Sequence, residues 1–136
     1  MKRVLAAAVA VPLLAALLAG PAQASGSDSA CGDPAVLGFI TSRFEYRAAQ
    51  YLGQDVSIFE IRKMAPSRFE PFTRYISSVE RQYCHARVTL TDGRERPMWY
   101  VIERPWGFAG VGRNIEFCIG GLDPWHVYGA RCSSLR

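Results

Sequence analysis

Two histidines are the obvious candidates for a general base, because imidazole is the side chain whose charge changes near neutral pH. His85 stands in a segment that alternates like a strand, and His126 stands in the turn sequence Asp123-Pro124-Trp125-His126. Asp123 has the right chemistry to orient His126. However, no serine lies in a G-x-S-x-G or S-x-x-K motif that would supply a nucleophile. We therefore interpret both histidines as structural or surface residues.

Two glutamates are the second candidate for acid–base chemistry. Glu103 and Glu116 fall on segments that are expected to be neighbouring strands. A carboxylate pair inside a folded sheet acts as acid and base when its pKa values lie near the working pH. The commoner role of such a residue is a salt bridge to a cross-strand arginine, here Arg104 or Arg113. We expect the salt bridge, and an acid–base site using Glu103, Glu116 or His85 is the alternative.

Aromatic side chains offer a binding site rather than a catalytic one. They gather in the C-terminal half, several of them in expected loops beside arginines, where stacking and cation–π contacts would form a ligand platform. The alternative is that these rings cover the open end of the core. The candidate ligand-binding residues are Trp106, Phe108, Arg113, Trp125 and Tyr128.

No motif indicates a cofactor or a metal. The glycine-rich segment 107–112 lacks the following helix and the Lys-Ser/Thr pair of a phosphate loop, so it predicts a hairpin loop. The cysteines form no C-x-x-C pair and have no zinc-like spacing. We therefore expect no cofactor and no metal site.

The four cysteines allow three disulfide pairings. If the segments carrying Cys84 and Cys118 flank a common strand, these residues lie about 10 Å apart. A disulfide joins Cα atoms roughly 4.4–6.8 Å apart, which disfavours this pair. Cys118 and Cys132 bracket a turn, so we favour Cys118–Cys132 with Cys31–Cys84. A rolled sheet that brought distant strands together would change this ranking.

The N-terminal segment predicts export. Lys2 and Arg3 precede an apolar run over 4–20, and Ala22-Gln23-Ala24 is a small-x-small cleavage pattern. We expect a signal peptide over 1–24 that is removed, which makes disulfides the expected state of the cysteines. The alternative is an uncleaved signal anchor. No later apolar run reaches the roughly 18 residues of a membrane span. The expected location is the periplasm or the medium.

One domain follows the signal. Residues 25–32 are small and polar and predict a flexible mature N-terminus, and 33–136 predicts a single disulfide-stabilised globular domain. The net charge is +4, of which Lys2 and Arg3 supply two. That balance is too weak to indicate a nucleic-acid partner.

The clearest expected element is a helix over 34–52. Asp33 is a good N-cap, Pro34 suits the first helical position, and Gly53 ends the helix. Apolar residues recur at three-to-four spacing, whereas Arg43 and Arg47 fall on the polar side.

Strands are expected after the helix. The segment 65–67 breaks the first one, 68–72 predicts a loop or irregular edge, and Asp92-Gly93 predicts a two-residue hairpin turn. Pro97 predicts an irregular start of its strand or an edge position. The expected strands cover 56–64, 78–91, 95–104, 114–119 and a short final strand within 125–132.

The fold class is therefore α+β, with one N-terminal helix packed on a bent antiparallel sheet of four to five strands. One helix cannot cover both faces of a wide sheet, so the sheet is expected to wrap around it. In shape this resembles a cystatin-like or NTF2-like roll. That resemblance is architectural and implies no function.

The sequence favours a small exported, non-enzymatic binding or interaction protein of a bacterial-type cell envelope. Its partner would be a small ligand or an envelope protein, bound by the loops 104–113 and 120–131. The alternative is a small isomerase or hydrolase with an acid–base site inside the roll. A deep pocket with two converging titratable groups would indicate the enzyme, and a filled core with aromatic residues at its rim would indicate the binding protein.

Overall fold

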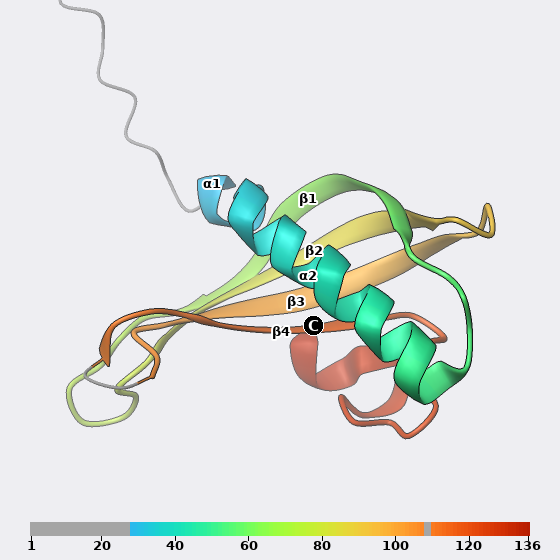
Figure 1. The fold of residues 1–136 in the computed structure, drawn as a ribbon. Coiled ribbons are helices and arrows are strands. Elements are labelled where there is room, and N and C mark those ends of the chain that lie inside the picture. The colour runs from blue at the N-terminus through green and yellow to red at the C-terminus, as the bar shows by residue number, and fades with distance from the viewer. Residues whose placement is uncertain (1–27, 108–109) are drawn as a thin grey trace, which may run out of the picture.

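The chain folds as one long helix on one antiparallel sheet, as Figure 1 shows for the computed structural model. The structure describes residues 28–107 and 110–136, so the expected signal peptide and Phe108 lie outside it. This is the α+β arrangement expected from the sequence. The elements in order are α1 (Asp28–Cys31), α2 (Pro34–Arg47), the π-helical turn η1 (Ala48–Leu52), β1 (Ile58–Glu70), β2 (Glu80–Leu90), β3 (Glu95–Arg104), β4 (Asn114–Ile119) and the 3-10 helix η3 (Ala130–Leu135).

Local signals at both ends explain the long helix. The Asp33 carboxylate accepts the Ala35 backbone N–H at 2.8 Å, and Pro34 occupies the first helical position. Gly53 has φ 59°, a left-handed conformation that favours glycine and ends η1. The predicted helical span of 34–52 is confirmed, with its last turn widened to a π-helix.

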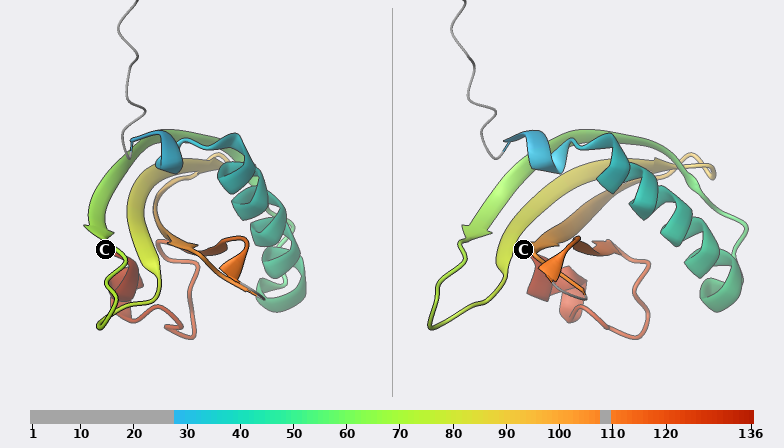
Figure 2. Two further views of the ribbon diagram at one scale, coloured as in Figure 1. Left: turned by 90° about the vertical axis from the view of Figure 1, so that its left-hand side faces the viewer. Right: turned by 60° about the vertical axis from the view of Figure 1, so that its left-hand side comes forward.

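The sheet is antiparallel throughout, in the order β1-β2-β3-β4, and it curves toward α2 (Figure 2). The predicted spans of β3 and β4 are confirmed. The prediction of a two-residue turn is wrong, because the Leu90 N–H donates to the Arg94 carbonyl at 3.0 Å and closes a three-residue loop. Gly93 there has φ 81°, which suits a turn ending in a left-handed residue.

The predicted break at 65–67 is also wrong, because β1 runs on to Glu70. Three register shifts against β2 accommodate it, after Ile58, Arg62 and Pro66. Each shift is a β-bulge, which inserts a residue and bends the strand without ending it. The curvature of the sheet at β1 follows from these bulges.

Pro66 fits inside β1 because its nitrogen faces away from β2. Neighbouring residues of a strand direct their N–H and C=O groups to opposite sides. The Leu90 N–H points to the β3 side. Cys84 is an even number of residues away in β2, so its backbone N–H and C=O also point to β3. Pro66 stands opposite Cys84, in a pair that makes no hydrogen bonds between β1 and β2. An edge strand tolerates proline at such a position.

Pro97 is accommodated differently, in a strand with neighbours on both sides. The Gly120 N–H donates to the Pro97 carbonyl at 2.8 Å, but proline has no N–H to return. The Arg96 guanidinium Nη1 donates to the Gly120 carbonyl at 3.0 Å instead. A side chain therefore supplies the hydrogen bond that the backbone lacks.

The predicted final strand within 125–132 is wrong. The Asp123 carboxylate accepts the backbone N–H groups of Val127 and Tyr128, both at 3.0 Å, and folds this segment into turns. Positive φ angles at His126 and Arg131, 52° and 54°, are incompatible with an extended strand. The chain then continues into η3.

Each face of the sheet has its own apolar cluster. The main core lies between α2 and the sheet, where Ile40 and Phe44 pack with Met98 and Tyr100. The opposite face carries a smaller cluster that η3 covers. Its buried members are Tyr83, Val101, Cys118, Cys132 and Leu135.

Two disulfides connect these layers, in the pairing that the sequence favoured. Cys31–Cys84 ties the start of the helical region to β2, and Cys118–Cys132 ties β4 to η3. The Cα atoms are 5.8 Å apart in both, within the range that a disulfide spans. Among the residues that the structure describes, no helix is long and apolar enough to cross a membrane.

Candidate functional site

A cavity of about 440 Å³ lies where the C-terminal half of the helix meets β4 and the segment 122–128, which we call the C-terminal wall. This volume falls within the range of small-molecule sites. The helix contributes Arg43, Phe44, Arg47, Tyr51 and Leu52; β4 contributes Phe117, Cys118 and Ile119; the C-terminal wall contributes Leu122, Asp123, Trp125, Val127 and Tyr128.

The helical side of the cavity follows from residue spacing. Arg43, Arg47 and Tyr51 are four residues apart, which puts them on one stripe of a helix. Phe44, next to this stripe, is buried in the main core. The same helix thus fills the core with one face and lines the cavity with the other. The Arg43 guanidinium itself lies 5.5 Å from the centroid of the Tyr46 ring, outside the lining.

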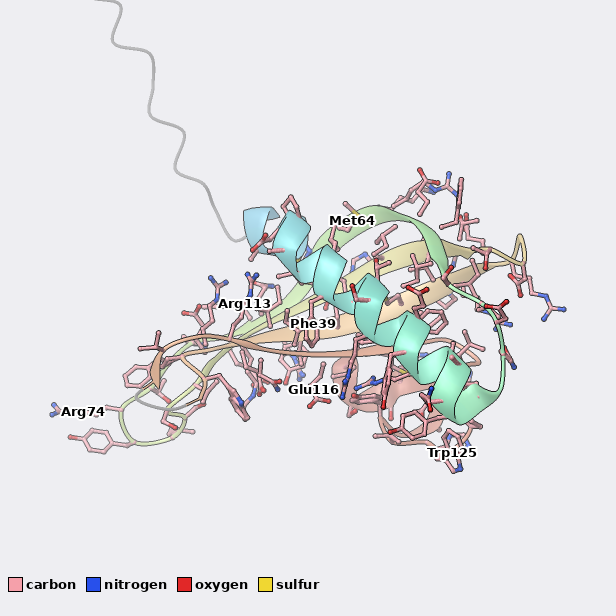
Figure 3. All side chains as sticks on the ribbon, viewed as in Figure 1. Phe39, Met64, Arg74, Arg113, Glu116 and Trp125 are labelled. Atoms are coloured by element: carbon pink, nitrogen blue, oxygen red, sulfur yellow. A yellow bond between two sulfur atoms is a disulfide. The ribbon has the colours of Figure 1, made fainter. Side chains whose placement is uncertain are left out.

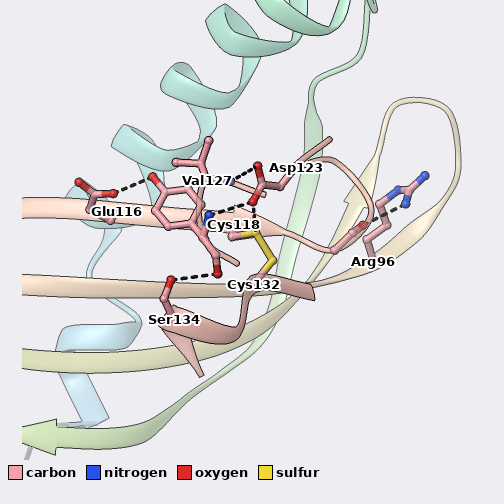
Figure 4. Close-up of a disulfide and its surroundings, with 9 residues drawn as sticks. Arg96, Glu116, Cys118, Asp123, Val127, Cys132 and Ser134 are labelled. Atoms are coloured by element: carbon pink, nitrogen blue, oxygen red, sulfur yellow. Dashed lines mark hydrogen bonds between the residues drawn. A yellow bond between two sulfur atoms is a disulfide. The ribbon is translucent and has the colours of Figure 1, made fainter. Parts of the chain in front are cut away.

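The C-terminal wall is held in place by its own hydrogen bonds and by a disulfide (Figure 4). Asp123 binds two backbone N–H groups, and the Tyr128 carbonyl accepts the Ser134 N–H and Oγ at 3.1 and 3.0 Å. The Cys118–Cys132 disulfide joins the strand on one side of the wall to η3 on the other. Since Asp123 is engaged with the backbone, the wall presents mainly Trp125, Val127 and Tyr128 to the cavity.

Positive charge dominates the helical side. The Arg47 guanidinium lies 4.8 Å from the centroid of the Phe117 ring, a cation–π contact. Within residues 28–107 and 110–136, neither Arg43 nor Arg47 forms a salt bridge. An anionic group entering the cavity would therefore meet arginines that have no carboxylate within salt-bridge distance, although Asp123 also lines the cavity.

The phenol on the opposite side stays neutral. The Tyr128 hydroxyl donates to Glu116 Oε2 at 2.7 Å. Burial, and next the hydrogen bond to the Glu116 carboxylate, raise the pKa of Tyr128. Tyr128 therefore contributes an apolar ring and an engaged hydroxyl, and Glu116 is committed to that hydroxyl.

The structure divides the predicted aromatic platform. Trp125 and Tyr128 line the cavity, whereas Trp106 and Arg113 lie beyond the opposite end of β4. Arg113 and Trp125 lie far apart in Figure 3. Six strand residues separate the two ends by roughly 20 Å. Arg113 instead donates to Asp33 Oδ2 at 2.6 Å, and this contact lowers the pKa of Asp33. Arg113 thus supports the start of α2.

The predicted acid–base residues lie outside the cavity lining. Glu103 accepts from Arg81 Nε at 2.7 Å and from Asn114 Nδ2 at 2.8 Å. The expected salt bridge is present, but its partner is Arg81, which stands directly opposite in the register, and not Arg104 or Arg113. His85 and His126 are exposed and do not line the cavity.

Sequence reasoning missed the helical half of the site. Arg43 and Arg47 fall on the polar side of the helix, which favours an exposed face. The available signal was the four-residue spacing of Arg43, Arg47 and Tyr51, two cations followed by an aromatic ring.

No comparison supplies a functional analogy. The chain matches no protein-family model, no curated protein and no solved structure. In the part of the chain that the structure describes, no group of three or more His, Cys, Asp or Glu side chains could hold a metal ion.

Proposed function

We propose that this protein is a small exported, non-enzymatic binding protein of a bacterial-type cell envelope, and that its ligand occupies the cavity beside β4. The ligand class is an apolar or aromatic molecule with an anionic group. One observation carries this proposal: Arg43 and Arg47 border an aromatic cavity of about 440 Å³ and have no carboxylate partner among the described residues.

The chemistry of the two sides supports an amphiphilic anion. Guanidinium binds carboxylate, sulfonate or phosphate through paired hydrogen bonds, which are stronger than neutral ones. Trp125 and Val127 are 64% and 70% exposed, so the C-terminal wall offers apolar surface that a ligand would cover. A ligand with both features would use both sides of the cavity.

The N-terminal sequence and the disulfides support export. A charged start, an apolar run and a cleavage pattern precede the domain. The domain itself contains two disulfides and no free cysteine among its described residues. Such bonds persist in oxidising compartments and are rare in the cytosol.

The titratable groups support binding rather than catalysis. Asp123 accepts two backbone N–H groups, and the Tyr128 hydroxyl donates to Glu116. No specific observation favours the isomerase or hydrolase alternative.

The direct test is a fluorescence titration with 1-anilinonaphthalene-8-sulfonate, an aromatic anion. We expect saturable binding, weakened at least tenfold by Trp125→Ala and by Arg47→Met, which keeps most of the apolar stem. Trp106→Ala and Arg131→Met are matched controls, because neither residue lines the cavity. Absence of saturable binding, or equal losses in Trp106→Ala and Trp125→Ala, would contradict the proposal.

Native mass spectrometry of protein purified from the periplasm without reductant complements this titration. We expect a mass that starts at Ser25 and lacks four hydrogens, which reports signal cleavage and two disulfides. A non-covalent mass that leaves on denaturation would identify a co-purified ligand. Four free thiols, or an uncleaved N-terminus, would contradict the exported form.

A further inference from the structure

The free edge of β4 forms one boundary of the cavity. The N–H of Gly120, the residue after β4, donates to the Pro97 carbonyl, so the backbone groups of Gly120 face β3. Every second residue before it, which means Cys118, Glu116 and Asn114, also directs its backbone groups to β3. The residues between them, Ile115, Phe117 and Ile119, direct theirs away from β3, where the sheet has no further strand.

These outward backbone groups are largely unpaired. The Ile119 carbonyl accepts the Leu122 N–H at 3.0 Å. For the N–H and C=O of Ile115 and Phe117, the structure shows no partner among the described residues. An unpaired peptide group costs free energy when it is removed from water, so a ligand that covers this edge is favoured if it supplies hydrogen bonds.

The cavity opens on this stretch of backbone. Phe117, Cys118 and Ile119 are consecutive lining residues, although their side chains alternate between the two faces of the sheet. The Cys118 sulfur is engaged in the disulfide on the face opposite α2. Because the side chains of these consecutive residues point to opposite faces of the sheet, a single cavity can border all three only along their backbone. The cavity therefore extends along the edge of the strand.

An extended polypeptide matches this edge better than a compact small molecule does. A peptide that adds to a sheet edge makes main-chain hydrogen bonds, and its alternate side chains enter the pockets beside the edge. Here the apolar lining of Phe44, Leu52 and Trp125 receives such side chains. The cavity is large enough for one or two of them, which limits the bound segment to a few residues.

The charge beside the edge selects the end of a chain. Arg47 lies against the ring of Phe117, next to the unpaired backbone, and Arg43 stands one helical turn away. The main chain of an internal peptide segment brings no charge to the Arg47 guanidinium, which lies directly beside the unpaired backbone. A C-terminal segment brings a carboxylate that binds a guanidinium fork.

We propose that the ligand is the C-terminal end of an extended polypeptide, which adds to β4 as a fifth strand and places its terminal carboxylate on Arg47. This inference rests on the proposed function, because it takes the cavity to be the binding site. Its partner is a protein or peptide with an apolar C-terminus.

The first experiment compares matched peptides by displacement of 1-anilinonaphthalene-8-sulfonate and by calorimetry. The panel consists of acetylated hexapeptides ending in valine, leucine, phenylalanine or tyrosine, each as free acid and as amide. We expect at least one free acid to bind and its amide to bind roughly tenfold more weakly, about 1.4 kcal/mol. N-methylation of the backbone nitrogen that would face β4 should weaken binding by a similar factor.

Arg47→Met separates the carboxylate contact from strand addition. In this variant we expect the acid and the amide to bind equally, whereas N-methylation still weakens both. Arg131→Met is the matched control and should retain the difference between acid and amide. Equal binding of acid and amide to the unmodified protein would overturn the carboxylate contact.

Amide hydrogen exchange gives a residue-level test of the fifth strand. Before binding, the N–H groups of Glu116 and Cys118 should exchange slowly, because they face β3, and those of Ile115 and Phe117 should exchange fast. A bound peptide should slow Phe117 at least tenfold, whereas the sulfonate probe, which has no peptide backbone, should slow it less.

The outcomes distinguish the two proposals. If the sulfonate probe binds at the cavity and no peptide of the panel does, the peptide inference is wrong and the binding function stands. If a peptide binds without protecting Phe117, strand addition is wrong. If neither probe nor peptide binds, both proposals are wrong.

Discussion

The two edges of the sheet differ in whether another strand could pair with them. The β1 edge is 13 residues long, with three register shifts and Pro66 among its outward-facing positions. The β4 edge is six residues long, pairs with β3 in one unbroken register and carries apolar residues at its outward positions. Bulges, proline and charges are devices that prevent association at an exposed edge. The β1 edge has all three devices, whereas β4 has neither a bulge nor a proline.

The elements around the β4 edge limit what can add to it. The helix and the C-terminal wall border the unpaired backbone, so only a short segment reaches it. Both α1 and α2 contact β1, and the bulges with Glu60, Arg62 and Lys63 protect its edge along its length. A sheet can therefore keep one edge accessible if neighbouring elements limit what enters.

Removing each disulfide separately is expected to have the largest effect. Chain entropy assigns about 4 kcal/mol to Cys31–Cys84 and about 3 kcal/mol to Cys118–Cys132, because the first closes the longer loop, with a sequence separation of 53 against 14. Each loss in the free energy of unfolding is measured by urea unfolding of a variant in which both cysteines of that disulfide are replaced by serine. Only loss of the second disulfide should abolish probe binding while the protein is folded, because it holds the wall beside β4. Equal loss of binding in both variants would contradict this assignment.

Tyr100→Phe tests the centre of the sheet, on which both edges depend. The buried Tyr100 hydroxyl donates to the Cys31 carbonyl at 2.6 Å, so we expect a loss of about 2 kcal/mol at neutral pH. The measurement is urea unfolding as a function of pH. Probe binding at the β4 edge should persist in the folded variant.

Alkaline pH acts on the same residue. Burial raises the pKa of Tyr100 above its ordinary value of about 10. The folded protein then keeps a proton that the unfolded chain releases, so stability should fall as the pH rises above about 10. The fall should be shallower in Tyr100→Phe. An identical pH dependence in both proteins would contradict the assignment.

Arg96→Met tests how firmly β4 is attached at its C-terminal end. The Gly120 carbonyl would lose its only observed donor, which we expect to cost about 1.5 kcal/mol in urea unfolding. In a Pro97→Ala background the restored backbone N–H can take over this carbonyl, so the cost should be smaller. An equal cost in both backgrounds would show that Arg96 does not replace the missing backbone donor.

Pro66→Ala should have the smallest effect and tests the β1 edge. The nitrogen of residue 66 faces away from β2, so the change adds no ladder hydrogen bond and costs less than about 1 kcal/mol through the entropy of the unfolded chain. Probe and peptide binding should not change. Peptide binding at β1 in this variant, detected as slowed exchange of the residue 66 amide, would show that proline alone closes that edge.

Periodic local patterns were sufficient to predict the helix, β3 and β4 from the sequence. The extent of β1 was not predictable in this way, because the cost of Pro66 depends on which side of the strand its nitrogen faces. The segment after Asp123 looked like a strand, but the Asp123 carboxylate folds it by binding two backbone N–H groups. Both errors arise from hydrogen bonds that residue type alone does not reveal.

The candidate site was half predictable. Trp125 and Tyr128 were recognisable as aromatic residues in an expected loop, and both line the cavity. Arg47 was not, because its contact with Phe117 depends on where the helix lies across the sheet. Trp106 and Arg113 looked equivalent to Trp125 by residue type, but a strand's length separates them from the cavity.

The Cys118–Cys132 disulfide has a consequence for when the protein becomes competent to bind. Cys118 borders the cavity and Cys132 lies beyond the C-terminal wall. The bond between them can form only after both residues have been made and their thiols have met an oxidant. A newly made chain in a reducing compartment would lack the covalent hold on that wall. Oxidation would thus complete the border of the cavity, and a reduced chain would not yet be competent to bind.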